Sequence, residues 1–185
     1  MRVRLMVILV LIGSFISCQK EVEIKDSRFR TWLNPDFKLE KGFLIKINMT
    51  VIYDDVFKVY YTENITEQFN ENKTLQSKIS GNKAEQIITF NFPKGIKPHK
   101  LRIDFGINKK QNYFDIKSIE INNYDDYLKI QQDSILTYFE IFNNNLFYDS
   151  ISKHYKVVKG PNKKYLPSIF STERLSNHII EWYKD

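Results

Sequence analysis

Two pairs of adjacent aspartates are the residues whose type and spacing come closest to hydrolytic chemistry. They are Asp54-Asp55 and Asp125-Asp126. Two carboxylates held some distance apart can hydrolyse a glycosidic bond, one as the acid and the other as the base or nucleophile. Each pair, however, interrupts a strand-like pattern, and neighbouring turn residues point in different directions. We therefore expect both pairs to form solvated turns rather than a catalytic site.

The other residue types that catalyse reactions or bind metals are scattered. His99, His154 and His178 fall in expected turns and in an expected terminal helix, whereas a metal site needs several ligands brought together. The sequence contains no zinc-protease pattern, phosphate-binding loop, nucleophile elbow or cysteine-nucleophile motif. We therefore expect no catalytic residue, no metal and no cofactor.

The charge pattern argues against a nucleic-acid partner. The formal net charge is +6, and Arg2 and Arg4 contribute to it from a segment that we expect to be removed. Lysines and carboxylates are interleaved along the rest of the chain, without the basic block that follows a phosphate backbone. The single cysteine also excludes an intrachain disulfide, so buried apolar side chains and sheet pairing must provide stability.

Aromatic side chains give the one positive indication of a ligand. Sugar-binding sandwiches place exposed Trp and Tyr rings against the apolar faces of pyranose rings, and ordinary sheet packing uses the same residues. Tyr60 and Tyr61 are consecutive, so in a regular strand one of them must face away from the core. The candidate ligand-binding residues are Trp32, Tyr60, Tyr61 and Tyr113.

Alternation of apolar and polar residues predicts successive strands over residues 29–123. Residues 43–53 alternate over a long stretch, and residues 56–61 follow the Asp54-Asp55 turn, so the two strands are expected to pair as a hairpin. Phe114 and Ile116 have one phase and Ile119 and Ile121 the other, which predicts a β-bulge or a strand that switches faces. Further strands are expected over 74–79, 88–92 and 101–105. This spacing predicts a mostly β fold, an antiparallel β-sandwich.

Residues 124–185 are expected to form a small C-terminal α/β appendage packed on the sandwich. Residues 135–142 fit either a helix or a strand, and periodicity does not decide between them. Residues 146–158 predict a small hairpin. Leu175, Ile179 and Trp182 are spaced for one face of a terminal helix, with Ser171 as its expected N-cap.

The N-terminal segment has the features of a secretory signal. Two arginines precede an apolar run over residues 5–12, which is too short for the roughly 20 residues that span a membrane as a helix. The run ends at Phe15-Ile16-Ser17-Cys18, which resembles the lipobox of bacterial lipoproteins, although Phe15 stands where leucine is usual. This resemblance implies that the signal peptide covers residues 1–17 and that Cys18 is acylated, for example with palmitate. Residues 18–28 would then form a lipidated tether to a membrane.

Gln19-Lys20-Glu21-Val22-Glu23 resembles the short export signal of some Bacteroidota lipoproteins, which directs them to the outer face of the outer membrane. A solvated tether is the alternative reading of the same residues. Location at the outer membrane is therefore expected, either surface-exposed or facing the periplasm. Two triplets, Asp133-Ser134-Ile135 and Asp149-Ser150-Ile151, resemble the O-glycosylation acceptor of exported Bacteroidota proteins, which would place modification at Ser134 and Ser150.

Residues 32–121 also resemble a β-sandwich module of bacterial cell-surface and polysaccharide-assembly proteins. The resemblance lies in residues 55–61, in Phe69 and in residues 101–106, and it implies a jelly-roll, carbohydrate-binding-like shape without any catalytic residue. We therefore expect a lipid-anchored, non-enzymatic binding or accessory module of the cell envelope whose ligand is a glycan. The alternatives are a structural subunit that packs on another envelope protein and, third, a small carbohydrate-active enzyme.

Overall fold

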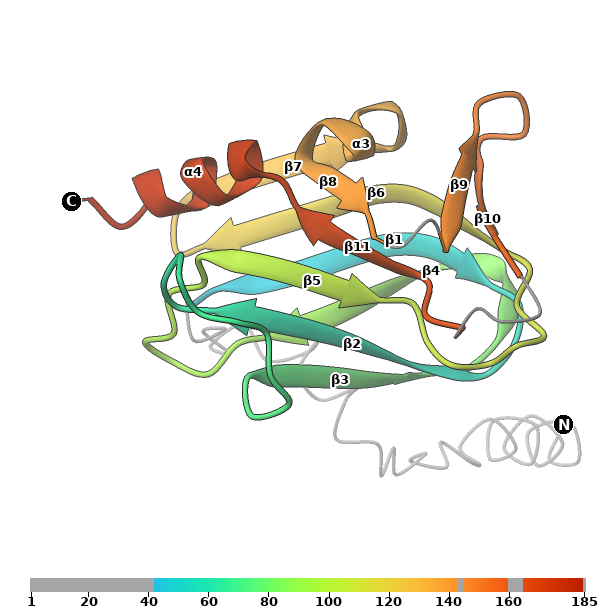
Figure 1. The fold of residues 1–185 in the computed structure, drawn as a ribbon, viewed down its shortest axis with the longest axis horizontal. Helices are drawn as coiled ribbons and strands as arrows, with labels where there is room; N and C mark the ends of the chain where they lie inside the picture. The colour runs from blue at the N-terminus through green and yellow to red at the C-terminus, as the bar shows by residue number, and fades with distance from the viewer. Residues whose placement is uncertain (1–41, 143–144, 160–164, 185) are drawn as a thin grey trace, which may run out of the picture. The chain divides into compact units, whose positions relative to one another are not determined.

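The computed structural model describes residues 42–142, 145–159 and 165–184, which form two antiparallel sheets packed as a sandwich (Figure 1). The first sheet has the order β4-β1-β6-β10-β9, and β7 also pairs with β6. The second has the order β3-β2-β5-β11-β8. The strands are β1 (Leu44–Val51), β2 (Asp55–Thr62), β3 (Thr74–Ile79), β4 (Asn82–Asn91), β5 (Lys100–Asp104), β6 (Tyr113–Asn123), β7 (Asp126–Gln131), β8 (Phe139–Ile141), β9 (Leu146–Asp149), β10 (His154–Val157) and β11 (Ser168–Ser171). Three short helical elements accompany them in the described residues: η2 (Gln132–Ser134), α3 (Ile135–Tyr138) and α4 (Glu173–Glu181).

The core lies between the two sheets, and the strands that line it turn apolar side chains toward each other. In β1, Ile45, Ile47 and Met49 are fully buried, and the residues between them are partly exposed. Across the core, Phe57 of β2 meets Phe114 of β6 edge to face, with ring centroids 6.0 Å apart. Burial of such side chains is the main driving force of folding. The predicted antiparallel sandwich is confirmed.

The hairpin expected between the first two strands is wrong. β1 pairs with β4 and β6 in one sheet, whereas β2 pairs with β3 and β5 in the other. The turn at Asp54-Asp55 therefore carries the chain from one sheet to the other. Alternation identifies the buried face of each strand, but it does not say which strand is its neighbour.

The predicted β-bulge in β6 is confirmed. Asn48 of β1 lies opposite Ser118, and the next residue, Met49, lies opposite Ile116. Lys117 is thus the extra residue on β6, which is the geometry of a bulge. Because of it, Phe114 and Ile116 face the core in one phase and Ile119 and Ile121 in the other.

The segment after residue 124 belongs to the sandwich itself. β7, β9 and β10 extend the first sheet, and β8 and β11 complete the second. The boundary expected between residues 123 and 124 therefore has no counterpart in the sheet topology. Residues 135–141 form a single turn of helix that runs directly into a strand, so the helix prediction and the strand prediction are each correct for part of this stretch. The hairpin predicted over 146–158 is present as β9 and β10, which project from the rest of the sheet (Figure 1).

The predicted terminal helix is present as α4, but its cap is Thr172 rather than Ser171. The Thr172 Oγ1 accepts a hydrogen bond of 3.4 Å from the Leu175 N–H. The Ser171 Oγ instead accepts the Leu101 N–H at 3.0 Å and ties β11 to β5. Leu175 and Ile179 are fully buried, so α4 packs its apolar face on the sandwich.

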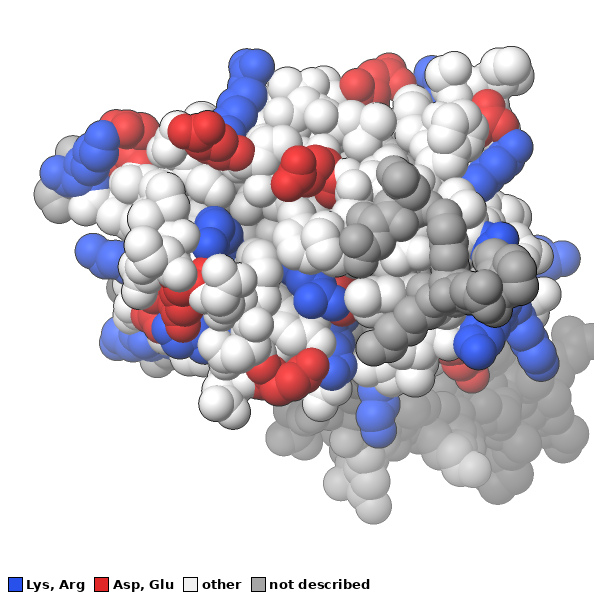
Figure 2. All heavy atoms as spheres, viewed as in Figure 1, with Lys and Arg blue, Asp and Glu red and all other residues white. Residues whose placement is uncertain are grey.

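Charge is mixed over the surface drawn in Figure 2, where basic and acidic side chains lie interspersed. Among the residues that the structure describes, no helix is long and apolar enough to cross a membrane. The expected signal peptide over 1–17, the tether over 18–28, Cys18 and Trp32 all lie outside the described residues.

Candidate functional site

The three described candidate tyrosines occupy different environments. Tyr61 lies in the core, where its ring meets that of Phe92 with centroids 5.2 Å apart. Tyr60 points to the other side of the same strand, as the alternation requires, but it is also buried. Tyr113 is partly exposed at the start of β6 and lines a cavity. Of the three, Tyr113 is the one whose surroundings suit a ligand.

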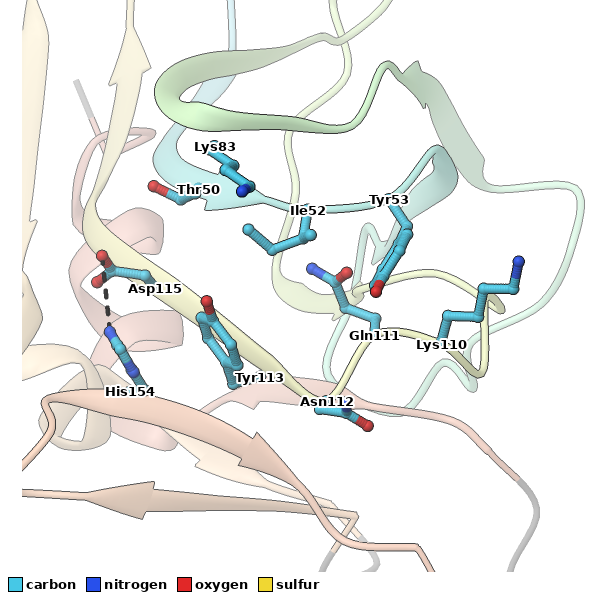
Figure 3. Close-up of a pocket in the computed structure, with 10 residues that line it drawn as sticks. All are labelled: Thr50, Ile52, Tyr53, Lys83, Lys110, Gln111, Asn112, Tyr113, Asp115 and His154. Carbon is cyan, nitrogen blue, oxygen red and sulfur yellow. Dashed lines mark ion pairs between the residues drawn. The ribbon is translucent and has the colours of Figure 1, made fainter.

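The cavity has a volume of about 570 Å³ and lies at one end of the first sheet, where several loops meet (Figure 3). We refer to it as the Tyr113 cavity. Its walls combine two tyrosine rings with amide, hydroxyl and charged groups, a mixture typical of sites for polar ligands. The lining residues are Thr50, Ile52, Tyr53, Lys83, Lys110, Gln111, Asn112, Tyr113, Asp115 and His154.

Strand geometry brings Tyr113, Asp115 and His154 together. Tyr113 and Asp115 are two residues apart on β6, so both side chains project from the outer face while Phe114 between them enters the core. β10 runs antiparallel to β6 with Tyr155 opposite Phe114. This register places His154 beside Asp115, and the histidine Nε2 lies 3.9 Å from a carboxylate oxygen.

The Tyr113 ring is held in place on one side. It stacks on the His154 imidazole with ring centroids 4.7 Å apart and planes inclined by 15°. In Figure 3 the ring lies between His154 and the Gln111 side chain, with Tyr53 beyond. Tyr53 comes from the crossing between β1 and β2 and is 42% exposed. The cavity thus presents a fixed ring and an accessible one.

Gln111 is the unusual residue of this site. Only 1% of its surface is exposed, and neither its Nε2 nor its Oε1 has a hydrogen-bond partner in the described structure. A buried primary amide without partners costs roughly 1–3 kcal/mol relative to one that is paired. Nothing in the sequence around Gln111 distinguishes it from an ordinary loop residue. A ligand that offers both a donor and an acceptor would satisfy the amide.

The loop that carries Gln111 is well anchored. Its backbone N–H donates to the Asn108 carbonyl at 3.0 Å, which closes a turn. The next residue, Asn112, accepts at its backbone carbonyl the Val157 N–H of β10, at 2.8 Å. Lys159 also donates to the carbonyl of Lys109 at 2.7 Å. The backbone that carries the Gln111 amide is therefore held by hydrogen bonds on both sides of the residue.

Tyr60 belongs to a different group of side chains on the outer face of the second sheet. We call this group, Lys58, Tyr60, Glu71, Arg102 and Asp104, the Tyr60 network. The Arg102 Nε and Nη2 donate to the two Asp104 oxygens, each at 2.7 Å. The guanidinium also lies over the Tyr60 ring, 4.6 Å from its centroid. The Tyr60 hydroxyl donates to Glu71 at 2.7 Å, and Lys58 pairs with the same carboxylate at 3.0 Å.

The pKa shifts follow from this pairing. Burial raises the pKa of the Asp104 carboxyl, and the Arg102 guanidinium acts in the opposite direction. The hydrogen bond from the Tyr60 hydroxyl, together with Lys58, lowers the pKa of Glu71. Burial also raises the pKa of the Tyr60 phenol, so it stays protonated and continues to donate. Each polar head group in the network thus has a partner.

The Asp54-Asp55 pair has a structural role. The Asp54 carboxylate accepts the Gly81 N–H at 2.7 Å, and Asp55 accepts the N–H groups of Ile107 and Asn108 at 2.8 and 3.1 Å. A Cβ on Gly106 would lie 2.2 Å from the Asp55 carboxylate, which explains the glycine there. The expected turn is confirmed, but the expectation that both carboxylates are solvated is wrong for Asp55, which is 8% exposed and begins β2 because its carboxylate binds the backbone of the loop after β5. Asp125-Asp126 lies at the turn from β6 to β7, also as expected.

The histidines do not assemble a metal site. No group of three or more His, Cys, Asp or Glu within the described ranges is placed to hold a metal ion. His154, which we expected in a turn, instead begins β10 and supports Tyr113. Of the two expected glycosylation sites, Ser150 is exposed in the turn after β9 and Ser134 is partly buried before α3.

No family model matches the sequence, and no curated protein or solved structure is significantly similar to it.

Proposed function

We propose that this chain is a lipid-anchored, non-enzymatic binding module of the bacterial cell envelope and that it binds carbohydrate in the Tyr113 cavity. The observation that carries the proposal is the buried, unpaired amide of Gln111 beside two tyrosine rings. Sugars present apolar C–H faces, which pack on aromatic rings, and hydroxyl groups that both donate and accept hydrogen bonds. The cavity provides a group for each kind of contact, tyrosine rings for the apolar faces and the unpaired amide for the hydroxyl groups.

The number and pairing of carboxylates in the cavity support a binding function rather than hydrolysis. Asp115 is the one carboxylate among the described lining residues, and cleavage of a glycosidic bond ordinarily uses two. Asp115 is also engaged, because it pairs with Lys117 at 2.9 Å and accepts the Gln132 amide at 3.3 Å. Neither interaction suits a general acid that must carry a proton.

The carbohydrate proposal is tested with a glycan array and two matched tyrosine variants. The mature protein, purified in detergent so that an anchor is retained, should bind a subset of glycans. Tyr53→Ala in the cavity should weaken binding about tenfold, the effect of losing roughly 1.4 kcal/mol of ring contact. Tyr127→Ala on β7, where Tyr127 is 53% exposed, removes a similar ring outside the cavity and should leave binding unchanged. A blank array for the unaltered protein would overturn the proposal.

The anchor is supported by the apolar run that ends at Cys18 and by the lack of any other cysteine in the chain. We expect the unaltered protein from a bacterial host to carry a lipid and Cys18→Ala to carry none. Intact-mass measurement of the two proteins detects this difference. An unmodified thiol at Cys18 would refute the anchor but not the carbohydrate site.

The second candidate function is a subunit that packs on another envelope protein. The observation that favours it is the β9–β10 hairpin, where Ile151 is 96% and Phe147 58% exposed. Apolar side chains this exposed at a projecting hairpin are typical of a protein contact. Phe147→Ser combined with Ile151→Ser would abolish such a contact while leaving the Tyr113 cavity intact, so the two functions are separable.

A further inference from the structure

The charges around the Tyr113 cavity are unevenly paired. Lys83, from β4, and Lys110, from the loop before β6, both line the cavity and are exposed. Neither ammonium group has an ion-pair or hydrogen-bond partner within the described part of the chain. The carboxylate of the site, on Asp115, is already engaged by Lys117 at 2.9 Å. The cavity therefore carries a net positive charge that the described residues do not neutralise.

The two lysines stand on different sides of the tyrosines. In Figure 3 Lys83 lies near Thr50 and Ile52, and Lys110 lies beyond Tyr53 on the opposite rim. A chain-like ligand resting on Tyr53 would thus meet an ammonium group at each end. Ammonium groups bind carboxylate and sulfate through charge-assisted hydrogen bonds, which are shorter and stronger than neutral ones.

Some lysines outside the cavity are paired with carboxylates of the described residues. Lys58 in the Tyr60 network pairs with Glu71 at 3.0 Å, and Lys129 pairs with Glu120 at 2.8 Å. Lys156 pairs with Asp149 on the β9–β10 hairpin. Lys78 and Lys94, which lie outside the cavity, also have no ion-pair partner among the described residues, so Lys83 and Lys110 are distinguished by lining the same cavity.

We propose that the ligand of the Tyr113 cavity is an acidic polysaccharide, whose carboxylate or sulfate groups pair with Lys83 and Lys110 while its sugar rings contact Tyr53 and Tyr113. This inference rests on the carbohydrate-binding function proposed above and narrows it to one class of sugar. The Gln111 amide binds a ring hydroxyl and so selects for sugar rather than for any polyanion.

Calorimetric titration of the mature protein with paired ligands tests the charge requirement. One pair is oligogalacturonate and its methyl ester, which share a backbone and differ in charge, and the other is a sulfated galactan oligosaccharide and its desulfated form. We expect at least one acidic member to bind about tenfold or more tightly than its neutral partner at low salt. The carboxylate and sulfate pairs also show which anion is preferred.

Salt and charge-removing variants give the second readout. Raising the ionic strength from about 0.01 to about 1 M shortens the screening length from about 30 to about 3 Å, so the acidic preference should shrink. Lys83→Gln combined with Lys110→Gln should also shrink it. Lys78→Gln combined with Lys94→Gln lowers the net charge equally at exposed positions outside the cavity and should leave the preference intact.

Each outcome has a defined meaning. Equal affinity for the acidic and neutral members would overturn the acidic preference and leave carbohydrate binding standing. An acidic preference that the Lys83/Lys110 and the Lys78/Lys94 variants reduce equally would also overturn it, because the attraction would then come from the overall charge. Absence of binding to every acidic and neutral ligand, together with a blank glycan array, would overturn both proposals.

Discussion

The Tyr113 cavity and the groove over the Tyr60 network have similar volumes, about 570 and about 610 Å³, and each is lined by a tyrosine from the sequence-based candidates. They differ in how their polar groups are paired. In the Tyr60 network, Arg102 is bonded to Asp104, and Tyr60 and Lys58 are bonded to Glu71. In the Tyr113 cavity, the side-chain amide of Gln111 and the ammonium groups of Lys83 and Lys110 have no partner among the described residues.

This difference separates a region that stabilises the fold from one that can bind a ligand. Polar groups that already satisfy each other lose those bonds when a ligand competes for them, so a ligand gains little there. An unpaired polar group in a rigid wall can form a new hydrogen bond with a ligand without breaking an existing one. Its removal from water has already taken place on folding, so binding does not require that free energy again. Cavity size and the presence of a tyrosine do not discriminate between the two regions, whereas the pairing does.

The largest expected effect is the loss of stability on removing Asp104. Asp104 is 5% exposed, and it neutralises an Arg102 side chain that is itself 19% exposed. Asp104→Ala would leave this guanidinium charge partly buried and unpaired between Tyr60 and Phe170, and we expect the unfolding free energy to fall by about 3 kcal/mol. Urea unfolding followed by circular dichroism measures the change.

Glycan binding by Asp104→Ala, measured where the variant is folded, should equal that of the unaltered protein. An exposed control, Lys78→Ala, should change stability by less than about 0.5 kcal/mol. If Asp104→Ala lost glycan binding but not stability, the roles assigned to the two regions would have to be exchanged.

A smaller effect of opposite sign is expected at Gln111. Gln111→Met replaces the unpaired amide by an apolar group of similar length, so the ligand-free protein should gain about 1 kcal/mol of stability. The same variant should bind glycan more weakly, because the ligand loses its amide partner. Urea unfolding and calorimetric titration of one preparation measure both quantities.

The matched control is Gln76→Met, at an exposed position on β3, for which we expect no change in either quantity. A loss of about 1 kcal/mol in Gln111→Met would show that the amide is paired in the folded protein, and the comparison of the two regions would fail.

The strands were predictable from the sequence, but their partners were not. The alternation in residues 43–53 identified β1 and its buried face, and the phase change in β6 indicated a bulge or a change of face, which the pairing with β1 shows to be a bulge at Lys117. Both are local consequences of the two-residue period of a strand. The crossing at Asp54-Asp55 depends on long-range pairing, so the same turn residues were compatible with a hairpin. For the same reason residues 126–171 could not be assigned to the two sheets beforehand.

The candidate site was predictable only in part. Tyr113 could be chosen as an aromatic residue on a predicted strand, but Tyr53, Lys83 and His154 approach it from three other segments. Gln111 could not be predicted as a site residue, because the lack of a hydrogen-bond partner for its amide is a property of the folded chain. Tyr61 was chosen as a candidate but lies in the core, because nothing in the sequence distinguishes a core tyrosine from one at a site.

The smallest expected effect is a pH dependence of stability in the Tyr60 network. The pKa of Glu71 is lowered from its usual value of 4.5 by the Tyr60 hydroxyl and by Lys58. The unfolded chain therefore takes up this proton at a higher pH than the folded one does. The stabilisation from Glu71 is complete above about pH 5 and disappears as the pH falls through the lowered folded pKa.

Comparison of the unaltered protein with Glu71→Gln between pH 7 and pH 3 isolates this contribution. The unaltered protein should be slightly the more stable at pH 7, and the difference should vanish toward pH 3, because the glutamine keeps hydrogen bonding but not charge. Glu85→Gln, at an exposed position on β4, is the control and should follow the unaltered protein closely. A difference that stayed constant with pH would show that Glu71 acts through packing, and the Tyr60 network would then not be held by charge at this position.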